Sequence, residues 1–330
     1  LLILKLNNKL IRLSRSDVGF NEQKNVSKVL EEGFLGIGKY VADFESEIKK
    51  FLHTEKNVVC VNSGTAALHL ALQAAGILPG DEVLVPTITY LATYQAIKAS
   101  GAIPISCDVG AKNLFLDLND AKKRLSRKTK VILPVHYGGN SDEMPEVYKF
   151  ANKHGLRVIE DAAHSFGSFR EAEMIGSVGD IICFSFDGIK NITCGEGGAI
   201  LSSDQNFINQ VEDARLLGVM KDSVKRYQGK RSWIFDVEKQ GWRYHMSNIN
   251  AAIGLAQIRN SEIKFQRKRK IAATYIKCFK NIEGIKTLEI FSKGTVNHIF
   301  PILVSFKIRD KIRELLLADK IETGLHYQPN

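Results

Sequence analysis

Short apolar runs alternate with amphipathic segments between residues 57 and 204 of this 330-residue chain. Most of the runs are apolar throughout, which is typical of strands buried on both faces of a parallel sheet. The segments between them have helical spacing, and three end at Gly76, Gly101 and Gly155, where helix C-caps are expected. The runs are NVVCV, EVLVP, PISCDV, KVILPVH, RVIED, DIICFSF and GGAILSS. We therefore predict an α/β fold whose large, mostly parallel sheet is covered by helices.

A different pattern begins beyond Ser247. One long helical segment, residues 248–279, is followed by a strand, HIFPILVSF, and a helix, RDKIRELLLADK. We predict a large domain at residues 1–250, with LLILKLNNKL as its N-terminal arm or strand. The connecting helix and a small α/β domain occupy residues 251–330. The chain stops directly after GLHYQPN without a closing strand, so we expect the small domain to continue beyond this point.

The composition is that of an ordinary globular protein, with 44% hydrophobic and 25% charged residues. The five cysteines stand singly, without a CxxC pair, and three lie in apolar, strand-like runs. This pattern favours a reduced, cytoplasmic protein with buried thiols over a disulfide framework or a zinc site. No apolar run approaches the roughly 20 residues of a membrane helix, so we expect no membrane partner.

The net charge of +10 is concentrated in one part of the chain. From Gln257 onward there are 15 Lys and Arg against 7 Asp and Glu, with the densest run at Gln266–Lys270. We interpret this run as the solvated face of a long helix. A phosphate-attracting surface ranks second. Nucleic acid ranks third, because no aromatic residues are interleaved with the charges.

The first motif with possible chemistry is VNSGTAALHLAL, where a strand ends and a helix begins near Gly64. Free backbone N–H groups at a helix start, together with the helix dipole, form an anion site. Ser63 and Thr65 add hydroxyl donors. A plain N-cap would have the same local sequence, so this motif alone is weak.

The second motif is RVIEDAAHSFGS, in which Asp161 ends a buried strand. Ligands of open α/β sheets bind at the carboxyl ends of the strands. A carboxylate buried there is costly unless a cation or donor pairs with it, and a protonated ring nitrogen would serve. An N-cap or a structural ion pair explains Asp161 equally well when it is taken alone.

The third motif is ICFSFDGIKNITCGEGGAI, which places Lys190 in a turn between two apolar strands. A lysine in a dry pocket has a lowered amine pKa and becomes a nucleophile that can form a Schiff base. Ser185 could donate its hydroxyl to a phosphate, and the glycines of GEGGA let backbone pass close to a ligand. The ordinary alternative is a solvated loop lysine.

Together the three motifs supply a phosphate cradle, a carboxylate for a ring nitrogen and an amine for an aldehyde. Pyridoxal phosphate has those three groups. Its ring also needs a flat surface, and Tyr90 in VPTITYLAT, just past the strand EVLVP, could stack on it. The alternative for Tyr90 is a core aromatic residue.

These residues resemble the DegT/DnrJ/EryC1/StrS sugar aminotransferases, which have the aspartate-aminotransferase-like fold type I. Eight blocks match in family order between about Ile11 and Ile258, and GLHYQP near the end matches as well. The blocks are SRSDVG, GFLGIGKYVADFE, NSGTAALHLAL, PGDEVLVPTITYLAT, VILPVHYGG, GLRVIEDAAHSFGS, GDIICFSFDGIKNITCGEGGAI and WRYHMSNINAAIGLAQI.

The resemblance implies a role for each matching residue. Lys190 would be the lysine that binds the cofactor aldehyde, Asp161 would pair with the pyridine nitrogen, and Tyr90 would stack on the ring. His164 would contact the cofactor near its phenolic oxygen. The phosphate would be held by Gly64, Thr65 and Ser185, and by Asn248 of a partner subunit, which implies a homodimer with shared sites.

The resemblance also implies the reaction, in which L-glutamate donates an amino group to a keto sugar on a nucleotide diphosphate. Some relatives have His in place of Lys190 and dehydrate sugars, so Lys190 favours transamination. The sequence GEGG after the lysine resembles the corresponding sequence of the members that aminate C4 rather than C3. His245 stands where many members have Arg. Two loops are expected to select the sugar, Gly33–Gly38 and Val219–Trp242. Their sequences do not indicate which sugar is bound.

Two other classes of protein remain as alternatives. A nicotinamide oxidoreductase needs a glycine fingerprint at the first strand–helix turn, which NSGTAA does not supply. A cofactor-bound regulator or sensor that binds DNA through its basic C-terminal face would show salt-sensitive DNA binding without turnover.

Overall fold

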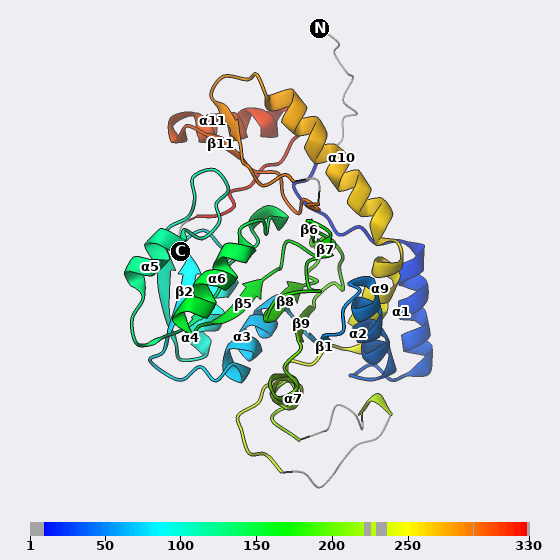
Figure 1. The fold of residues 1–330 in the computed structure, drawn as a ribbon. Helices are drawn as coiled ribbons and strands as arrows, with labels where there is room; N and C mark the ends of the chain where they lie inside the picture. Colours follow the sequence, from blue (N-terminus) through cyan, green and yellow to red (C-terminus); the bar gives the residue numbers. More distant parts are fainter. Residues whose placement is uncertain (1–9, 221–225, 229–235, 293, 329–330) are drawn as a thin grey trace.

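The computed structural model describes residues 10–328 except 221–225, 229–235 and 293. Its centre is a seven-stranded sheet in the order β1-β9-β8-β5-β4-β2-β3 (Figure 1). The strands are β1 (Asn57–Val61), β2 (Glu82–Pro86), β3 (Ile103–Cys107), β4 (Thr129–Ile132), β5 (Arg157–Asp161), β8 (Ile181–Ser185) and β9 (Gly198–Ser202). Each of the seven apolar runs found in the sequence overlaps one of these strands, although β3 and β4 each begin one residue before the run.

The sheet is parallel except at β9, which runs antiparallel to both of its neighbours, β1 and β8. The other pairs, from β8 through β5, β4 and β2 to β3, are parallel. The predicted α/β class with a mostly parallel sheet is therefore confirmed. One consequence matters for function: Asp161 and Ser185 end neighbouring parallel strands at the same edge of the sheet.

Helices cover both faces of the sheet. On one face, α2 and α9 pack on β1, β8 and β9, while α5 and α6 cover β2, β4 and β5. On the other face, α3, α4 and α7 form a second apolar layer. The bounds are α1 (Phe20–Glu32), α2 (Lys39–Phe51), α3 (Gly64–Ala74), α4 (Leu91–Ala99), α5 (Leu118–Arg124), α6 (Met144–His154), α7 (Gln205–Ala214) and α9 (Asn248–Arg259).

The predicted long helix over residues 248–279 is two helices, α9 and α10 (Ser261–Phe279). The chain departs from helical geometry at Asn260, where φ is −111° and ψ is 12°. Asn260 Nδ2 donates to the carbonyl of Ala256, and Ser261 Oγ donates to that of Ile258. Such short side chains compete with the helix for its own carbonyls, which explains a break at this point.

Beyond α10, the two-stranded sheet of β10 (Ile285–Thr287) and β11 (Ile302–Val304) is followed by α11 (Phe306–Ala318) (Figure 1). Near the other end of the chain, Ile11 pairs with Ile321, next to α11. Most of the predicted arm LLILKLNNKL lies outside the described residues. The domain limits at residues 250 and 251 stay a prediction.

Smaller elements connect these parts. The 3₁₀ turn η1 (Tyr137–Gly139) follows β4, and the short hairpin of β6 (Phe169–Arg170) and β7 (Glu173–Met174) precedes β8. Gly155 ends α6 in the left-handed conformation with φ of 67°, as its predicted C-cap role requires. Four of the five cysteines are buried, and none of the helices in the described ranges is long and apolar enough to cross a bilayer.

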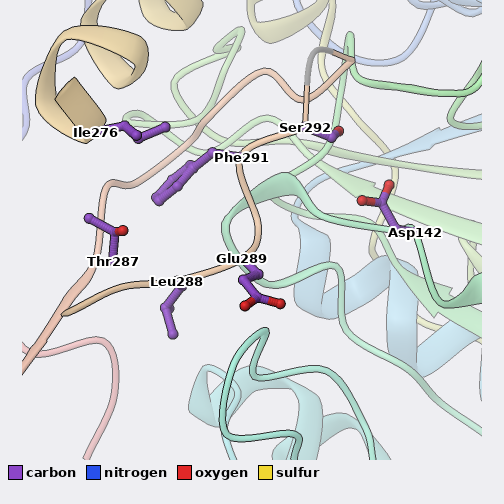
Figure 2. Close-up of a pocket in the computed structure, with 7 residues that line it drawn as sticks. All are labelled: Asp142, Ile276, Thr287, Leu288, Glu289, Phe291 and Ser292. Carbon is purple, nitrogen blue, oxygen red and sulfur yellow. The ribbon is translucent and has the colours of Figure 1, made fainter. Parts of the chain in front are cut away.

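A cavity of about 270 Å³ lies between the small sheet and the start of α6 (Figure 2). It is lined by Asp142, Ile276, Thr287, Leu288, Glu289, Phe291 and Ser292. None of these residues is a predicted site residue, and no amine is among them. The cavity therefore does not supply the groups that pyridoxal phosphate needs.

Candidate active site

Asp161 is buried at the carboxyl end of β5, with 6% of its surface exposed. Its Oδ2 accepts a hydrogen bond from Thr93 Oγ1 at 2.9 Å, and its Oδ1 accepts one from the Ala163 amide at 3.2 Å. Burial raises the pKa of Asp161, while the two hydrogen bonds and the charge of Lys190 oppose that rise. Asp161 makes no ion pair within the described part of the chain, so a cationic partner from a ligand would fit it.

Lys190 lies in the turn after β8, and its amide donates to the Asp187 carbonyl at 3.1 Å. Burial lowers the pKa of its amine, and attraction to Asp161 and Asp187 opposes the effect. Among the described residues, Nζ has no hydrogen-bond or ion-pair partner. A desolvated amine without a fixed partner is suited to act as a nucleophile or base.

The start of α3 packs directly against the end of β8. A Cβ added to Gly64 would lie 2.8 Å from Ser185 Cβ, and one added to Gly198 would lie 2.5 Å from the Ser63 carbonyl oxygen. Gly198 pairs with both Val61 and Ser185 across β9. The glycines thus let three chain segments meet around the first turn of α3.

This arrangement leaves the first turn of α3 free to bind an anion. Ser63 Oγ accepts from the Ala66 amide at 3.1 Å, so it caps the helix and keeps its own hydroxyl proton available. The amides of Gly64 and Thr65 have no partners inside the helix, as in any first turn. Thr65 is exposed and Ser185 is 7% exposed. The structure therefore brings together Ser63, Gly64, Thr65 and Ser185.

His164 is buried on the turn after β5 and is uncharged. Burial lowers its pKa well below the usual value, and the charge of Lys190 lowers it further. Its Nδ1 accepts from the Gly138 amide at 3.3 Å, so Nε2 carries the proton and faces Tyr327 Oη at 3.2 Å. Tyr327 also lies beside Tyr90, with 5.7 Å between the ring centroids.

Tyr90 and Asp161 are linked through Thr93. Tyr90 caps α4 and is 61% exposed, so its ring is not part of the core. The Thr93 amide donates to the Tyr90 carbonyl at 3.1 Å, while the Thr93 hydroxyl holds Asp161. Thr93 therefore joins the backbone of Tyr90 to the carboxylate of Asp161.

Asn248 is placed apart from these residues. It is 2% exposed, and its Nδ2 donates to the Phe34 carbonyl at 2.8 Å within the same chain. Its amide lies at 3.1 Å from the Leu35 carbonyl and 2.9 Å from that of Gly36. Asn248 Oδ1 is buried without a partner among the described residues. The structure shows Asn248 holding the predicted loop Gly33–Gly38, and its role toward a partner subunit stays a prediction.

His245 pairs with Val61 at the edge of the sheet, close to the start of α3. Burial, then the charge of Arg243, lowers its pKa to about 4, so it is uncharged at neutral pH. It therefore does not replace the positive charge of the arginine that the resemblance implies at this position. In the predicted loop Val219–Trp242, residues 221–225 and 229–235 lie outside the described part.

Two residues of the site were not identified from the sequence. Thr93 lies in the quoted block PTITYLAT, one helical turn after Tyr90, and this spacing was an available signal. Tyr327 lies in GLHYQP, but it meets His164 across 163 residues of chain. Only the fold reveals that contact.

The residues present fit pyridoxal phosphate. Asp161 is a buried carboxylate that would hold the ring nitrogen. Lys190 is a half-buried amine that would hold the aldehyde. A Cβ at Gly64 or Gly198 would clash with the neighbouring chain. Because both positions are glycine, the chain packs closely around the start of α3, which would hold the phosphate. Tyr90 is exposed at the same edge and would cover the ring face.

Comparison with known proteins agrees with this fit. The spore coat polysaccharide biosynthesis protein SpsC of Bacillus subtilis is 36% identical over 318 residues, which are 94% of this chain and 82% of that protein. GDP-perosamine synthase of Vibrio cholerae is 36% identical over 256 residues, or 77% of this chain and 67% of that protein.

Solved structures show the same similarity. The putative sugar aminotransferase Spr1654 of Streptococcus pneumoniae superposes with a TM-score of 0.88 at 26% identity, in a form containing pyridoxamine phosphate. The match covers 97% of this chain and 85% of that one. PseC of Helicobacter pylori, an aminotransferase of pseudoaminic acid biosynthesis, has a TM-score of 0.87 at 29% identity, with 97% and 85% coverage.

A family profile decides the assignment. The profile of the DegT/DnrJ/EryC1/StrS aminotransferase family matches residues 17–330, which is nearly the whole chain. Both the fold and the set of site residues agree with it. The chain therefore belongs to the DegT/DnrJ/EryC1/StrS aminotransferase family, whose cofactor is pyridoxal phosphate.

Proposed function

We propose that this enzyme transfers an amino group from L-glutamate to C4 of a nucleotide-linked keto-deoxy sugar, for the synthesis of a surface glycan of the lipopolysaccharide or O-antigen type. The observation that carries the proposal is the joint placement of Lys190 and Asp161 at the sheet edge beside the α3 anion site. Similarity to a GDP-perosamine synthase and to a coat polysaccharide protein supports the sugar class.

Each site residue has one task in this proposal. Ser63, Gly64, Thr65 and Ser185 bind the phosphate, Asp161 holds the ring nitrogen in its protonated form, and Tyr90 and His164 orient the ring. When bound, pyridoxal phosphate supplies an electron sink for the charge that develops on the donor carbon. The chain supplies binding, orientation and the movement of a proton.

Lys190 is the group that moves the proton. Its Nζ would take the proton from the α-carbon of the donor amino acid and hold it until it is returned. The amine must be uncharged to accept that proton, and burial favours this state because it lowers the pKa of Lys190.

We further infer a cytoplasmic homodimer with sites shared between the subunits. Four apolar side chains are exposed on α1 and on the loop that follows it, which Asn248 holds, and apolar surface of this kind is typical of subunit interfaces. They are Phe20, Leu30, Phe34 and Leu35, which are 74%, 55%, 39% and 43% exposed. Analytical ultracentrifugation tests the dimer, and a monomer at micromolar concentration would refute it.

The proposed function is tested in two stages. In the first, the visible absorbance of the purified protein is recorded before and after addition of L-glutamate. A shift from the pyridoxal band to the pyridoxamine band establishes the first half-reaction and the donor. L-Alanine and L-aspartate serve as comparison donors, and a faster reaction with either would refute the choice of glutamate.

In the second stage, the pyridoxamine form is mixed with GDP-, UDP- and dTDP-linked 4-keto and 3-keto deoxy sugars. Return of the pyridoxal band identifies the acceptor, and NMR of the product locates the new amino group. Amination at C3 would refute the C4 assignment. Loss of water from the sugar without amination would make the enzyme a dehydratase, and no reaction together with salt-sensitive DNA binding would support a regulator.

A further inference from the structure

The basic run Gln266–Lys270 on α10 is not the wholly solvated face that the sequence suggested. Three of its residues are exposed, whereas Lys268 and Arg269 are half-buried. Arg269 Nη2 donates to the Gly167 carbonyl at 3.3 Å, so this part of α10 lies against the turn after β5. Lys268 contacts a second turn, the one after β8 that carries Lys190.

Lys268 reaches Asn191, the residue directly after Lys190. Its Nζ donates to Asn191 Oδ1 at 2.8 Å. The contact does not depend on the charge of Lys268, since an ammonium group and an uncharged amine both have N–H groups to donate. Burial lowers the pKa of Lys268 to about 8, and the charges of Lys264 and Lys190 lower it further. Lys268 makes no ion pair within the described part of the chain, so its amine loses water for a hydrogen bond to an amide.

The amide group of Asn191 binds three further carbonyls. Asn191 is 5% exposed, and its Nδ2 donates to the carbonyls of His164 at 3.2 Å, Phe166 at 3.1 Å and Val296 at 3.2 Å. These contacts decide the orientation of the amide, because the flipped group would turn its oxygen toward three carbonyl oxygens. The side chain therefore joins the turn after β8 to the turn after β5, to the segment before β11 and, through Lys268, to α10.

This junction places the backbone from which Lys190 extends. Two hydrogen bonds inside the turn, from the Lys190 amide to the Asp187 carbonyl at 3.1 Å and from the Ile189 amide to Asp187 Oδ1 at 3.2 Å, shape the turn itself. The Asn191 side chain fixes the turn relative to the neighbouring turn that carries His164. A change at Asn191 would therefore move the turn of Lys190 as a unit.

We propose that Lys268 and Asn191 are positioning residues, which hold the turn after β8 so that Lys190 Nζ reaches the aldehyde of the cofactor. The inference rests on the role proposed above for Lys190. In that bond the nitrogen of the uncharged amine becomes doubly bonded to the aldehyde carbon, and the aldehyde oxygen leaves as water with the two amine hydrogens. Because the nitrogen and the carbon must meet, a displaced turn weakens this bond while the start of α3 still binds the phosphate.

The experiment compares the affinity of the apoprotein for pyridoxal phosphate with its affinity for pyridoxamine phosphate. Both molecules present the same phosphate and ring, but only pyridoxal phosphate has the aldehyde that Lys190 binds. The ratio of the two dissociation constants, measured by equilibrium dialysis, therefore isolates the contribution of Lys190. A general loosening of the site would weaken both affinities together and leave the ratio unchanged.

Two substitutions test the junction from its two ends. In Lys268→Met, which removes the N–H groups of the side chain, we expect the preference for pyridoxal phosphate over pyridoxamine phosphate to fall about fivefold, as for the loss of one hydrogen bond. Asn191→Ala should lower the preference at least as much, and it keeps the test decisive if Lys268→Met fails to fold. Lys268→Arg, which still has N–H groups for Asn191, should recover part of the preference.

Lys264→Met is the matched control. Lys264 lies one turn earlier on α10 and is also half-buried, but its Nζ donates to the Asp17 carbonyl at 3.0 Å and to Gln257 Oε1 at 3.2 Å. This variant should keep the wild-type preference. An unchanged preference in the folded variants of Lys268 and Asn191, or an equal fall in Lys264→Met, would overturn the proposal.

Lys190→Ala separates this inference from the proposed function. If Lys190→Ala keeps the wild-type preference for pyridoxal phosphate, Lys190 does not hold the aldehyde, and both ideas are wrong at that residue. If Lys190→Ala loses the preference while Lys268→Met and Asn191→Ala keep it, only the positioning role is wrong. The choice of sugar acceptor does not affect either result.

Discussion

Gly198→Ala is a small change that should weaken cofactor binding strongly. Gly198 lies in β9 between Val61 on β1 and Ser185 on β8, directly under the start of α3. A Cβ at this position would lie 2.5 Å from the Ser63 carbonyl oxygen, 2.7 Å from its carbonyl carbon and 2.9 Å from the Gly64 nitrogen. All three are backbone atoms, so no side-chain rotation can relieve the overlap.

The size of the effect follows from these distances. Ordinary contacts of a Cβ begin near 3.4 Å, so the first turn of α3 would have to move by nearly 1 Å. Hydrogen bonds to an anion tolerate only a few tenths of an ångström around about 2.9 Å, so at least one bond to the phosphate would be lost. A hydrogen bond to a charged group contributes about 1.5–3 kcal/mol, which corresponds to roughly 10- to 150-fold in the dissociation constant.

The assay is a titration of apoprotein with pyridoxal phosphate, followed by the absorbance of the bound cofactor. Gly19→Ala is the control, since its added Cβ would meet only Glu22 Oε2 at 3.8 Å. We expect wild-type affinity for Gly19→Ala and at least tenfold weaker binding for Gly198→Ala. Wild-type affinity in Gly198→Ala would refute the assignment of the α3 start as the phosphate site.

Three further predictions concern single residues. Lys190→Ala should prevent covalent attachment of the cofactor, so mass spectrometry after borohydride treatment should show no added mass, and added mass on this variant would contradict the assignment. Arg215 is fully buried and donates to Glu45 Oε1 at 2.7 Å. Arg215→Met should therefore lower the free energy of unfolding in urea by about 3–5 kcal/mol, whereas Arg309→Met, at an exposed ion pair, should lower it by less than about 1 kcal/mol. The folded pKa of His245, about 4, lies below its ordinary 6.5, so the unfolded chain binds more protons and stability falls as the pH drops through that window. Urea midpoints at pH 7.5 and pH 5 should differ less in His245→Gln than in the wild type, and an equal difference would refute this.

The strands could be predicted because both faces of the sheet are covered. A strand buried on both sides, such as Ile181–Ser185, is apolar throughout and stands out against its amphipathic neighbours. The break between α9 and α10 could not be predicted in the same way. It depends on where the side chains of Asn260 and Ser261 point, while the apolar spacing continues across them.

The same difference between local and long-range signals explains which site residues could be predicted. Asp161 was identified because it ends a buried strand, and Lys190 because it lies in the turn between two buried strands. The ends of parallel strands meet at one edge of a sheet. Thr93 contacts Asp161 across 68 residues, and Tyr327 contacts His164 across 163. Such contacts depend on helix placement and on the return of the small domain, neither of which has a local sequence signal.

The site keeps a carboxyl group and an amine near each other, and no ion pair joins them among the described residues. Asp161 is held by Thr93 and Ala163, and Lys190 is held by its turn, so in the described part of the chain each is desolvated without an ionic partner that would offset the loss of water. A ligand with a cationic ring nitrogen and an aldehyde would relieve both costs at once. Binding of pyridoxal phosphate should therefore stabilise the fold beyond the contribution of its phosphate. Pyridoxal phosphate at 100 times its dissociation constant should raise the free energy of unfolding by about 2.7 kcal/mol. Inorganic phosphate at the same absolute concentration should have almost no effect, because it reaches only the α3 site.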